Sequence, residues 1–402
     1  MRTVLVTGPG GAGRTTIAAA TALAGARRGG RVLLLTARGG AAERALGTRL
    51  GRPGDGPVPV APGLHVRCVD PGDHFRREVL AFQERAEAAL DLLGAAPLDE
   101  DELTELPGAE AFALLHELRA AHEASREPDG PDTVVVDMPP AADTVALLAL
   151  PEQARRYLRR LLPPERQAAR ALRPVLAQLA GVQLPTQKLY EAAERWEREL
   201  AAVQRIIDHP GTTVRIVTEA GPAAVADLRE VRCGLALHGH RTDAVVANRL
   251  LPTGSADPFL AALSGQQQSA LKALREDFPE VPVVEVPHLG REPEGTAELD
   301  ELVRGTVGEA AAPGAAEDPW TVEDRLAPDG ILVWRVPLPG AERDGLGLLR
   351  RGDEVVVTAG RFRRIRTLPS ALRRCSVSGA GLRDGALHIR FTPDPDLWPR
   401  GH

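Results

Sequence analysis

Short apolar runs recur along the first three quarters of the chain and alternate with longer segments of helical periodicity. The runs, which are typical of buried strands, cover residues 3–6, 32–36, 64–69, 133–137, 213–218, 244–248 and 282–286. Strands that alternate with helices indicate a mainly parallel sheet with helices on both faces. The pattern therefore predicts an α/β domain over residues 1–308.

Two long segments inside this domain have charged, amphipathic helical patterns. They are predicted as helical insertions at about residues 72–120 and 152–207. In the second segment, leucines recur at helical spacing, and we expect them to pack against the sheet. The alternative is an exposed groove that accepts an apolar helix from a client protein.

The period changes after residue 308. Residues 309–328 are rich in alanine and proline and are predicted as a linker. Beyond them, apolar and polar residues alternate at 331–336, 354–358, 362–366 and 387–391, with turns between the runs. Residues 329–402 are therefore predicted as a small antiparallel β-sandwich domain.

Composition narrows the class of protein. The net charge of −6 comes from 49 basic and 55 acidic residues that are interspersed along the 402 residues, which does not indicate a nucleic-acid partner. No apolar run approaches the roughly 18 residues of a membrane span, and the amino terminus lacks the pattern of a signal peptide. We therefore expect a cytoplasmic protein without a transmembrane segment.

Cysteine and histidine spacing gives no metal signature. Cys68, Cys233 and Cys375 lie far apart, so they predict neither a disulfide framework, a zinc site nor a thiol cluster for arsenite. His238 and His240 fall in a His-Gly-His stretch that is expected to be a solvated loop.

The strongest chemical signal is the loop after the first strand, which reads Gly8-Pro-Gly-Gly-Ala-Gly-Arg-Thr15. It matches the phosphate-binding pattern G-x-x-x-x-G-K-[ST] at every position except Arg14. Its four glycines let successive backbone N–H groups point at an anion, and the dipole of the following helix adds to the attraction. The loop predicts phosphate binding, with a tight turn that has lost its ligand as the alternative.

Two further residues complete a predicted magnesium site. The Thr15 hydroxyl is expected to hold Mg²⁺ directly. Asp137 ends the apolar strand Thr133-Val-Val-Val-Asp137, which is the form of a Walker B carboxylate that reaches Mg²⁺ through water.

The identity of Arg14 has to be weighed against a general bias of the chain. Lys188 and Lys272 are the only lysines, against 47 arginines, which suggests a GC-rich coding background. A working P-loop lysine is expected to resist that drift, because arginine binds as a bulky planar fork rather than as a compact point charge. Arg14 therefore indicates a relaxed demand for catalysis.

Several segments in order along the chain resemble the ArsA family of P-loop ATPases, which includes the arsenite-pump ATPase and tail-anchored-protein-targeting relatives. The resemblance covers about residues 1–306 and rests on the glycine loop together with Asp70-Pro71, Leu106-Pro107-Gly108, Asp137, Pro140, Thr144, Leu150-Pro151 and Asn248-Arg249. The final β domain resembles the α-crystallin-like module of bacterial members, through Trp334-Arg-Val-Pro-Leu-Pro-Gly340 and Arg351-Gly-Asp-Glu-Val-Val-Val357.

This resemblance implies an ATP site that uses Mg²⁺ and a dimer with nucleotide near the shared face. It assigns adenine recognition to Asn248, and Thr15 and Asp137 to Mg²⁺. The nucleotide-binding residues that it implies, together with the loop chemistry, are Gly8, Gly10, Gly11, Ala12, Gly13, Arg14, Thr15, Thr16 and Asn248.

The sequence also departs from the family pattern where charge matters. The signature lysine that reaches the partner's phosphates is replaced by Pro9, and the P-loop lysine by Arg14. The first switch, D-P-A-H-S in the family, begins with Arg38, so the expected water-positioning aspartate is a cation. The T-G-H of the second switch is Ala141-Ala142-Asp143, and the adenine-side Pro-Glu pair is Ala220-Gly221.

These features together predict an ArsA-like protein that binds ATP with Mg²⁺ and hydrolyses it weakly or not at all, with no assignable catalytic residue. The predicted assembly is a homodimer, or a heterodimer with an intact ArsA-like paralogue, with a protein client as a further partner. Two alternatives stay open: a nucleotide-free scaffold or regulatory partner that binds proteins, and an active ATPase in which other residues compensate.

Overall fold

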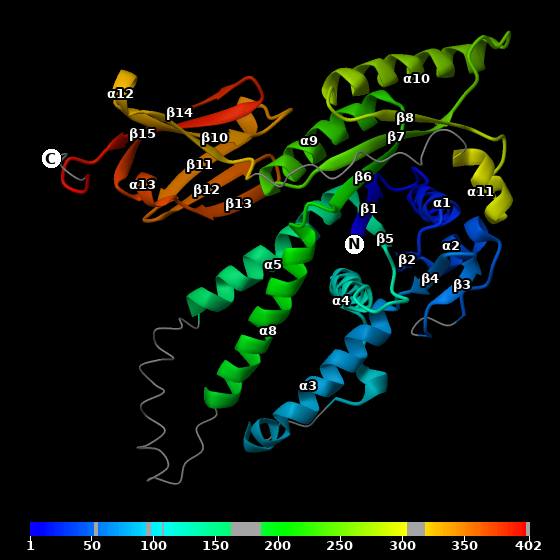
Figure 1. The fold of residues 1–402 in the computed structure, drawn as a ribbon, viewed down its shortest axis with the longest axis horizontal. Helices are drawn as coiled ribbons and strands as arrows, with labels where there is room; N and C mark the ends of the chain where they lie inside the picture. Colours follow the sequence, from blue (N-terminus) through cyan, green and yellow to red (C-terminus); the bar gives the residue numbers. More distant parts are fainter. Residues whose placement is uncertain (52–54, 94–97, 107, 162–185, 304–317, 399–402) are drawn as a thin grey trace.

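The computed structural model describes residues 1–402 except 52–54, 94–97, 107, 162–185, 304–317 and 399–402. Much of the second predicted insertion and the start of the predicted linker therefore lie outside the described residues. Figure 1 shows an α/β body and, beside it, a module built of strands. None of the helices in the described parts is both long enough and apolar enough to span a membrane.

The body is organised around one eight-stranded sheet in the order β3-β4-β2-β5-β1-β6-β7-β8. All neighbouring strands are parallel except β3, which is antiparallel to β4. The strands are β1 (Arg2–Gly8), β2 (Val32–Thr36), β3 (Val58–Ala61), β4 (Leu64–Cys68), β5 (Thr133–Pro140), β6 (Thr212–Glu219), β7 (Thr242–Leu250) and β8 (Val283–Pro287). This confirms the predicted fold class.

Helices cover both faces of the sheet because its strands are apolar on both sides. Val4 and Val6 of β1 belong to one buried cluster and Leu5 belongs to the other, so the strand separates two cores. The first core contains α1 (Arg14–Arg27), α2 (Gly39–Leu46) and α11 (Gly295–Val303). The second contains α4 (Ala109–Ala124), α5 (Ala141–Leu161), α8 (Thr186–Ile207), α9 (Pro222–His238) and α10 (Pro258–Asp277).

Three helices extend away from the sheet. In Figure 1, α5, α8 and α3 (Pro71–Leu93) project together beyond the strands, and a short 3₁₀ turn, η1 (Glu100–Glu102), follows α3. Arg155 of α5 pairs with Glu197 of α8 at 2.9 Å, so these two helices lie side by side. The described parts of both predicted insertions are thus mainly helical.

The β module consists of two antiparallel sheets, β14-β15-β10-β9 and β11-β12-β13. Its elements are β9 (Thr321–Arg325), α12 (Leu326–Asp329), β10 (Ile331–Pro337), η2 (Arg343–Gly345), β11 (Leu346–Arg351), β12 (Glu354–Ala359), β13 (Phe362–Thr367), α13 (Ser370–Arg373), β14 (Cys375–Arg383) and β15 (Ala386–Pro393). Trp334, which is fully buried, lies in its core.

The module packs directly on the body. A Cβ added at Gly234 of α9 would lie 2.6 Å from the ring of Phe362, so only glycine lets β13 approach this closely. Ion pairs flank the contact, including Arg361 with Glu230 at 2.8 Å and Arg156 with Glu354 at 2.7 Å.

Some elements were not predicted from the sequence. β9 falls within the segment 309–328 that was predicted as a linker, and it pairs with β10, so part of that segment belongs to the module's sheet. All five residues of β9 are exposed, so its sequence carries no apolar alternation. Helix α2 and strand β3 likewise lie between the predicted strands 32–36 and 64–69, in a glycine- and proline-rich stretch for which no element was predicted.

Candidate functional site

The glycine loop connects β1 to α1 at the carboxyl edge of the central strands, between β5 and β6. A Cβ added at Gly8 would lie 1.9 Å from the carbonyl oxygen of Val217, so no larger residue fits there. At Gly10 and Gly11 an added Cβ would meet nothing within 4 Å. Gly11 and Gly13 adopt φ values of 84° and 88°. The positive φ angles and the open space at Gly10 and Gly11 are features that a phosphate-binding loop needs, and phosphate binding itself stays a prediction.

Thr15 and Asp137, the two predicted magnesium residues, lie in contact next to the glycine loop. The Thr15 hydroxyl donates to Asp137 Oδ2 at 2.7 Å, and the Thr36 hydroxyl donates to the same oxygen at 2.9 Å. Asp137 is only 1% exposed, and among the described residues its Oδ1 has no hydrogen-bond partner. Burial raises the pKa of the carboxyl group, although both hydroxyls oppose the rise. A buried carboxylate oxygen without a partner fits a hydrated Mg²⁺.

The Arg14 side chain is buried beside the loop and is already hydrogen-bonded. It is 7% exposed, and its Nη1 donates to the carbonyl oxygen of Met138 at 2.5 Å. Burial, with the nearby charge of Arg38 adding to it, lowers the pKa of the guanidinium group. Arg38 itself has a buried Nε without a hydrogen-bond partner among the described residues. The two cations thus lie near each other beside the end of β5.

Asn248 and Arg249 hold the loop from the other side. Asn248 Nδ2 donates to the carbonyl oxygen of Ala12 at 2.9 Å, and an added Cβ at Gly13 would lie 2.3 Å from the same nitrogen. Arg249 has a φ of 57°, and its Nη1 donates to the carbonyl oxygen of Gly11 at 2.8 Å. The base-reading role assigned to Asn248 stays a prediction, and its contact with the loop was not foreseen.

Arg249 also closes the side of the loop where a base is expected. It forms ion pairs of 2.6 Å with Glu219, at the end of β6, and with Glu292, in the segment after β8. The cavity next to Gly13 and Thr16 is only about 20 Å³. Such a space holds about one water molecule, so a nucleobase needs Arg249 and its partners to move.

A hydroxyl cluster ties the loop strand to the segment after β5. Thr7 and Thr144 each donate to the carbonyl oxygen of Pro139 at 2.8 Å, and their hydroxyl oxygens are 2.9 Å apart. Thr144 belongs to the first turn of α5, so these hydrogen bonds connect β1 directly to that helix. Pro9, where the family has its signature lysine, is half-buried next to this strand.

His238 and His240 are not in a solvated loop, and that prediction was wrong. His238 ends α9 and is 6% exposed, and His240 is partly buried. The module causes this burial, because Arg364 of β13 donates to the carbonyl oxygen of Leu237 at 2.9 Å. Burial lowers the pKa of each imidazole to about 3, with Arg364 contributing, so both are neutral at pH 7.

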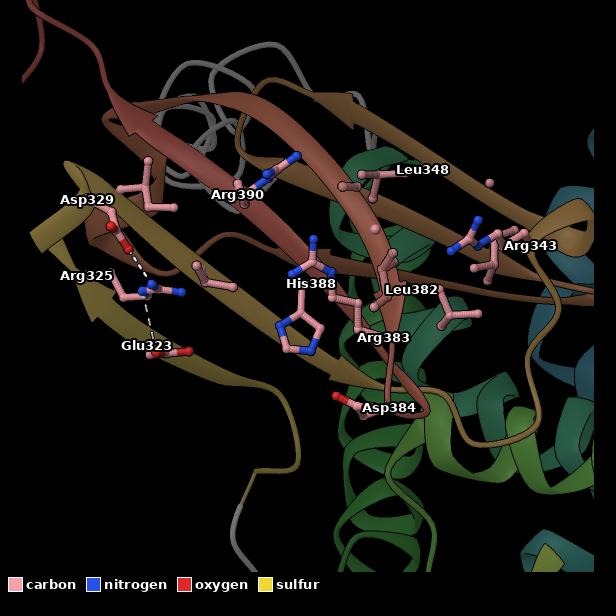
Figure 2. Close-up of a pocket in the computed structure, with 17 residues that line it drawn as sticks. Glu323, Arg325, Asp329, Arg343, Leu348, Leu382, Arg383, Asp384, His388 and Arg390 are labelled. Carbon is pink, nitrogen blue, oxygen red and sulfur yellow. Dashed lines mark ion pairs between the residues drawn. The ribbon is translucent and has the colours of Figure 1, made fainter.

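A larger hollow, of about 960 Å³, lies on the β module rather than at the glycine loop. Figure 2 shows Arg343, Arg383 and Arg390 around it, with Leu348 and Leu382 between them. Arg325 in the same hollow pairs with Glu323 and Asp329. This hollow contains no part of the predicted nucleotide site, and size alone does not make it one.

Comparison with known families agrees with this geometry. Residues 1–306 match the ArsA ATPase family, described as anion-transporting ATPase, and residues 329–391 match the HSP20-like domain found in ArsA. The second match covers most of the β module.

Relatives extend the match over nearly the whole chain. The chain is 54% identical to "Uncharacterized protein SCO2128" of Streptomyces coelicolor over 403 residues, which covers 100% of both chains. It is 30% identical to "Protein Rv2184c" of Mycobacterium tuberculosis, over 99% of this chain and 97% of that protein. It is 27% identical to "Putative arsenical pump-driving ATPase 1" of Aquifex aeolicus, over 93% and 95% of the two chains. The chain therefore belongs to the ArsA family of P-loop ATPases and carries the HSP20-like domain found in that family.

Proposed function

We propose that this chain binds ATP with Mg²⁺ and acts mainly through its nucleotide-bound state, because it hydrolyses the nucleotide slowly or not at all. The observation that carries the proposal is Asp137, whose buried Oδ1 has no partner in the described structure although Thr15 and Thr36 satisfy Oδ2. Thr15 and Asp137 would hold Mg²⁺, which supplies charge neutralisation at the phosphates. Gly8, Gly10, Gly11 and Gly13 would present backbone N–H groups to the phosphates.

Weak hydrolysis follows from the charges around the loop. Phosphoryl transfer depends on positioned charge, and removing one such element costs about 10²–10³ in rate. Arg14 is engaged with the Met138 carbonyl, Arg38 is a cation where the family has a water-orienting aspartate, and Pro9 carries no charge. Three losses together bring turnover close to the uncatalysed rate.

The missing charge at Pro9 also bears on assembly. In the family, the lysine at this position completes the partner's phosphate site, so a homodimer of this chain would lack that cation on both sides. A heterodimer with an intact ArsA-like paralogue would supply it in one of the two sites. We therefore propose that this chain is the regulatory half of such a pair.

The test is a titration of the purified full-length chain with a fluorescent ATP analogue, with and without Mg²⁺. The proposal predicts saturable binding that Mg²⁺ strengthens, and a loss of that Mg²⁺ effect in Asp137→Asn. Asp344→Asn is the matched control, because Asp344 is an exposed carboxylate of the β module, outside the glycine loop and the segments around it. It should bind as the wild type does.

The outcomes separate the three functions that the sequence left open. Failure to saturate at millimolar nucleotide, with an intact fold, overturns the proposal and leaves the protein-binding scaffold. The ion pairs of Arg249 and the 20 Å³ cavity beside Gly13 favour that second function. Steady turnover that disappears in Arg14→Ala would instead establish an active ATPase with compensating residues.

A further inference from the structure

A second polar cavity lies where the β module meets the α/β body. Its volume is about 360 Å³, and its wall includes Thr212, His238, His240, Arg364 and Arg366. Thr212 begins β6 and His238 ends α9, so the cavity lies at the amino edge of the sheet. The glycine loop lies at the carboxyl edge, and the two sites are therefore separate.

Buried nitrogens without partners gather beside this cavity. In the described structure, His238 Nδ1, His240 Nε2 and Trp320 Nε1 have no hydrogen-bond partner. His238 and Pro319 line the cavity. Trp320, which is 4% exposed, is the next residue after Pro319 in the chain. Buried polar groups in native proteins are nearly always bonded to protein, water or a ligand. A volume of this size fits a small organic molecule as well as water.

The cavity carries more donors than acceptors. Arg364 and Arg366 of β13 lie 5.5 Å and 5.2 Å from the centre of the Trp320 ring. Arg364 bonds to Glu152 and to the Leu237 carbonyl, and Arg366 bonds to Asp318 through Nη2. Their remaining N–H groups make no hydrogen bond within the described chain.

The lining of the cavity carries three arginines, Arg241, Arg364 and Arg366, against two aspartates, Asp208 and Asp318. Asp318 is half-exposed, so water screens its charge at the rim. Asp208 is partly desolvated, and burial raises the pKa of its carboxyl group. Arg364 is only 10% exposed, and its charge helps burial to hold the pKa of His238 and His240 at about 3. An anion inside the cavity would meet this positive potential directly.

We propose that this junction cavity binds a small oxyanion, a carboxylate or phosphate group, through His238, His240 and Arg366. A metal ion is the poorer fit, because no group of three or more His, Cys, Asp or Glu side chains in the described parts of the chain could hold one. The two histidines belong to the body and Arg366 to the module, so the anion bridges the two and stabilises their contact.

The test is a titration of the full chain with inorganic phosphate and, separately, with succinate, followed by the imidazole ¹H–¹⁵N resonances of His238 and His240. Sodium chloride at matched ionic strength is the reference. Arg366→Gln is expected to weaken binding about tenfold, which corresponds to about 1.4 kcal/mol. Arg335→Gln, an exposed arginine of β10 outside the cavity, is the matched control and should bind as the wild type does.

Phosphate could also bind at the glycine loop, so Arg14→Gln is measured in parallel. The proposal predicts saturable shifts whose midpoint Arg14→Gln leaves unchanged and Arg366→Gln moves to about tenfold higher ligand concentration. Saturation by phosphate alone assigns a phosphate ligand, and saturation by succinate alone assigns a carboxylate. Shifts that are linear, that chloride reproduces, or that follow Arg14 rather than Arg366 would overturn the site and leave water as its occupant.

Discussion

Asp137→Asn is expected to make the ligand-free protein more stable while it removes the effect of Mg²⁺. In the wild type, Thr15 and Thr36 both donate to Asp137 Oδ2, and the buried Oδ1 has no partner in the described structure. Asparagine keeps one acceptor oxygen for both hydroxyls and removes a buried negative charge. The asparagine Nδ2 takes the place of Oδ1 and also lacks a partner there, so the gain comes from removing the buried charge. Burying a charged group without a partner costs more than burying a neutral one, which costs about 1–3 kcal/mol, so the free energy of unfolding should rise by about 1 kcal/mol.

The pKa shift of Asp137 gives this prediction its sign. Burial raises the pKa of the carboxyl group in the folded state, so folding disfavours the charged form, which is the form of the unfolded chain at pH 7. The ionised Asp137 therefore destabilises the ligand-free fold, and a neutral side chain relieves that cost. A binding site keeps such a group because its ligand completes it.

Urea unfolding at pH 7, with and without ATP and Mg²⁺, measures both effects. A ligand that binds only the folded state at 100 times its Kd adds about 2.7 kcal/mol to stability. The wild type should gain with ATP and Mg²⁺ together, and Asp137→Asn should gain little beyond ATP alone. The reasoning is refuted if Asp137→Asn is destabilising without ligand, or if it responds to Mg²⁺ as fully as the wild type does.

Three further predictions address hydrolysis, the loop backbone and acid stability. Arg14→Lys combined with Arg38→Asp should raise ATP hydrolysis at least about tenfold, measured as phosphate release, and no gain in a folded double variant would point to the missing cation at position 9. Gly8→Ala should lower the free energy of unfolding by about 1–3 kcal/mol, because its Cβ would meet a β6 carbonyl 1.9 Å away, whereas Gly10→Ala should cost far less. His238 has a pKa lowered to about 3, so its contribution to stability is complete above about pH 6.5 and is lost as the pH falls, by up to about 1.4 kcal/mol per unit. His238→Gln should flatten this dependence in urea unfolding between pH 6.5 and 5, and an unchanged slope would contradict the buried neutral imidazole.

The sequence predicted the parts of the site that depend on local pattern. The turn at Gly8 and the hydroxyl of Thr15 belong to one short motif, and Asp137 ends an apolar strand that the sheet places beside that motif. Parallel strands bring their carboxyl ends to one edge, so the pairing of Thr15 with Asp137 follows from the order of elements.

The contacts that the sequence could not predict are set by tertiary packing. Asn248 reaches the Ala12 carbonyl across 236 positions of sequence, and no local pattern specifies that bond. The direction of the Arg14 side chain depends on the carbonyl of Met138, which lies near the end of β5. His238 resembles a loop residue until Arg364 and the rest of the β module cover it.

The fate of bound ATP tests the central claim most directly. The full chain is incubated with ATP and Mg²⁺ and separated from free nucleotide, and the bound nucleotide is extracted and identified over several hours. The account predicts bound nucleotide in a fixed ratio to protein, recovered as intact ATP. A chain that retains no nucleotide, or one that returns ADP with steady release of phosphate, would contradict it.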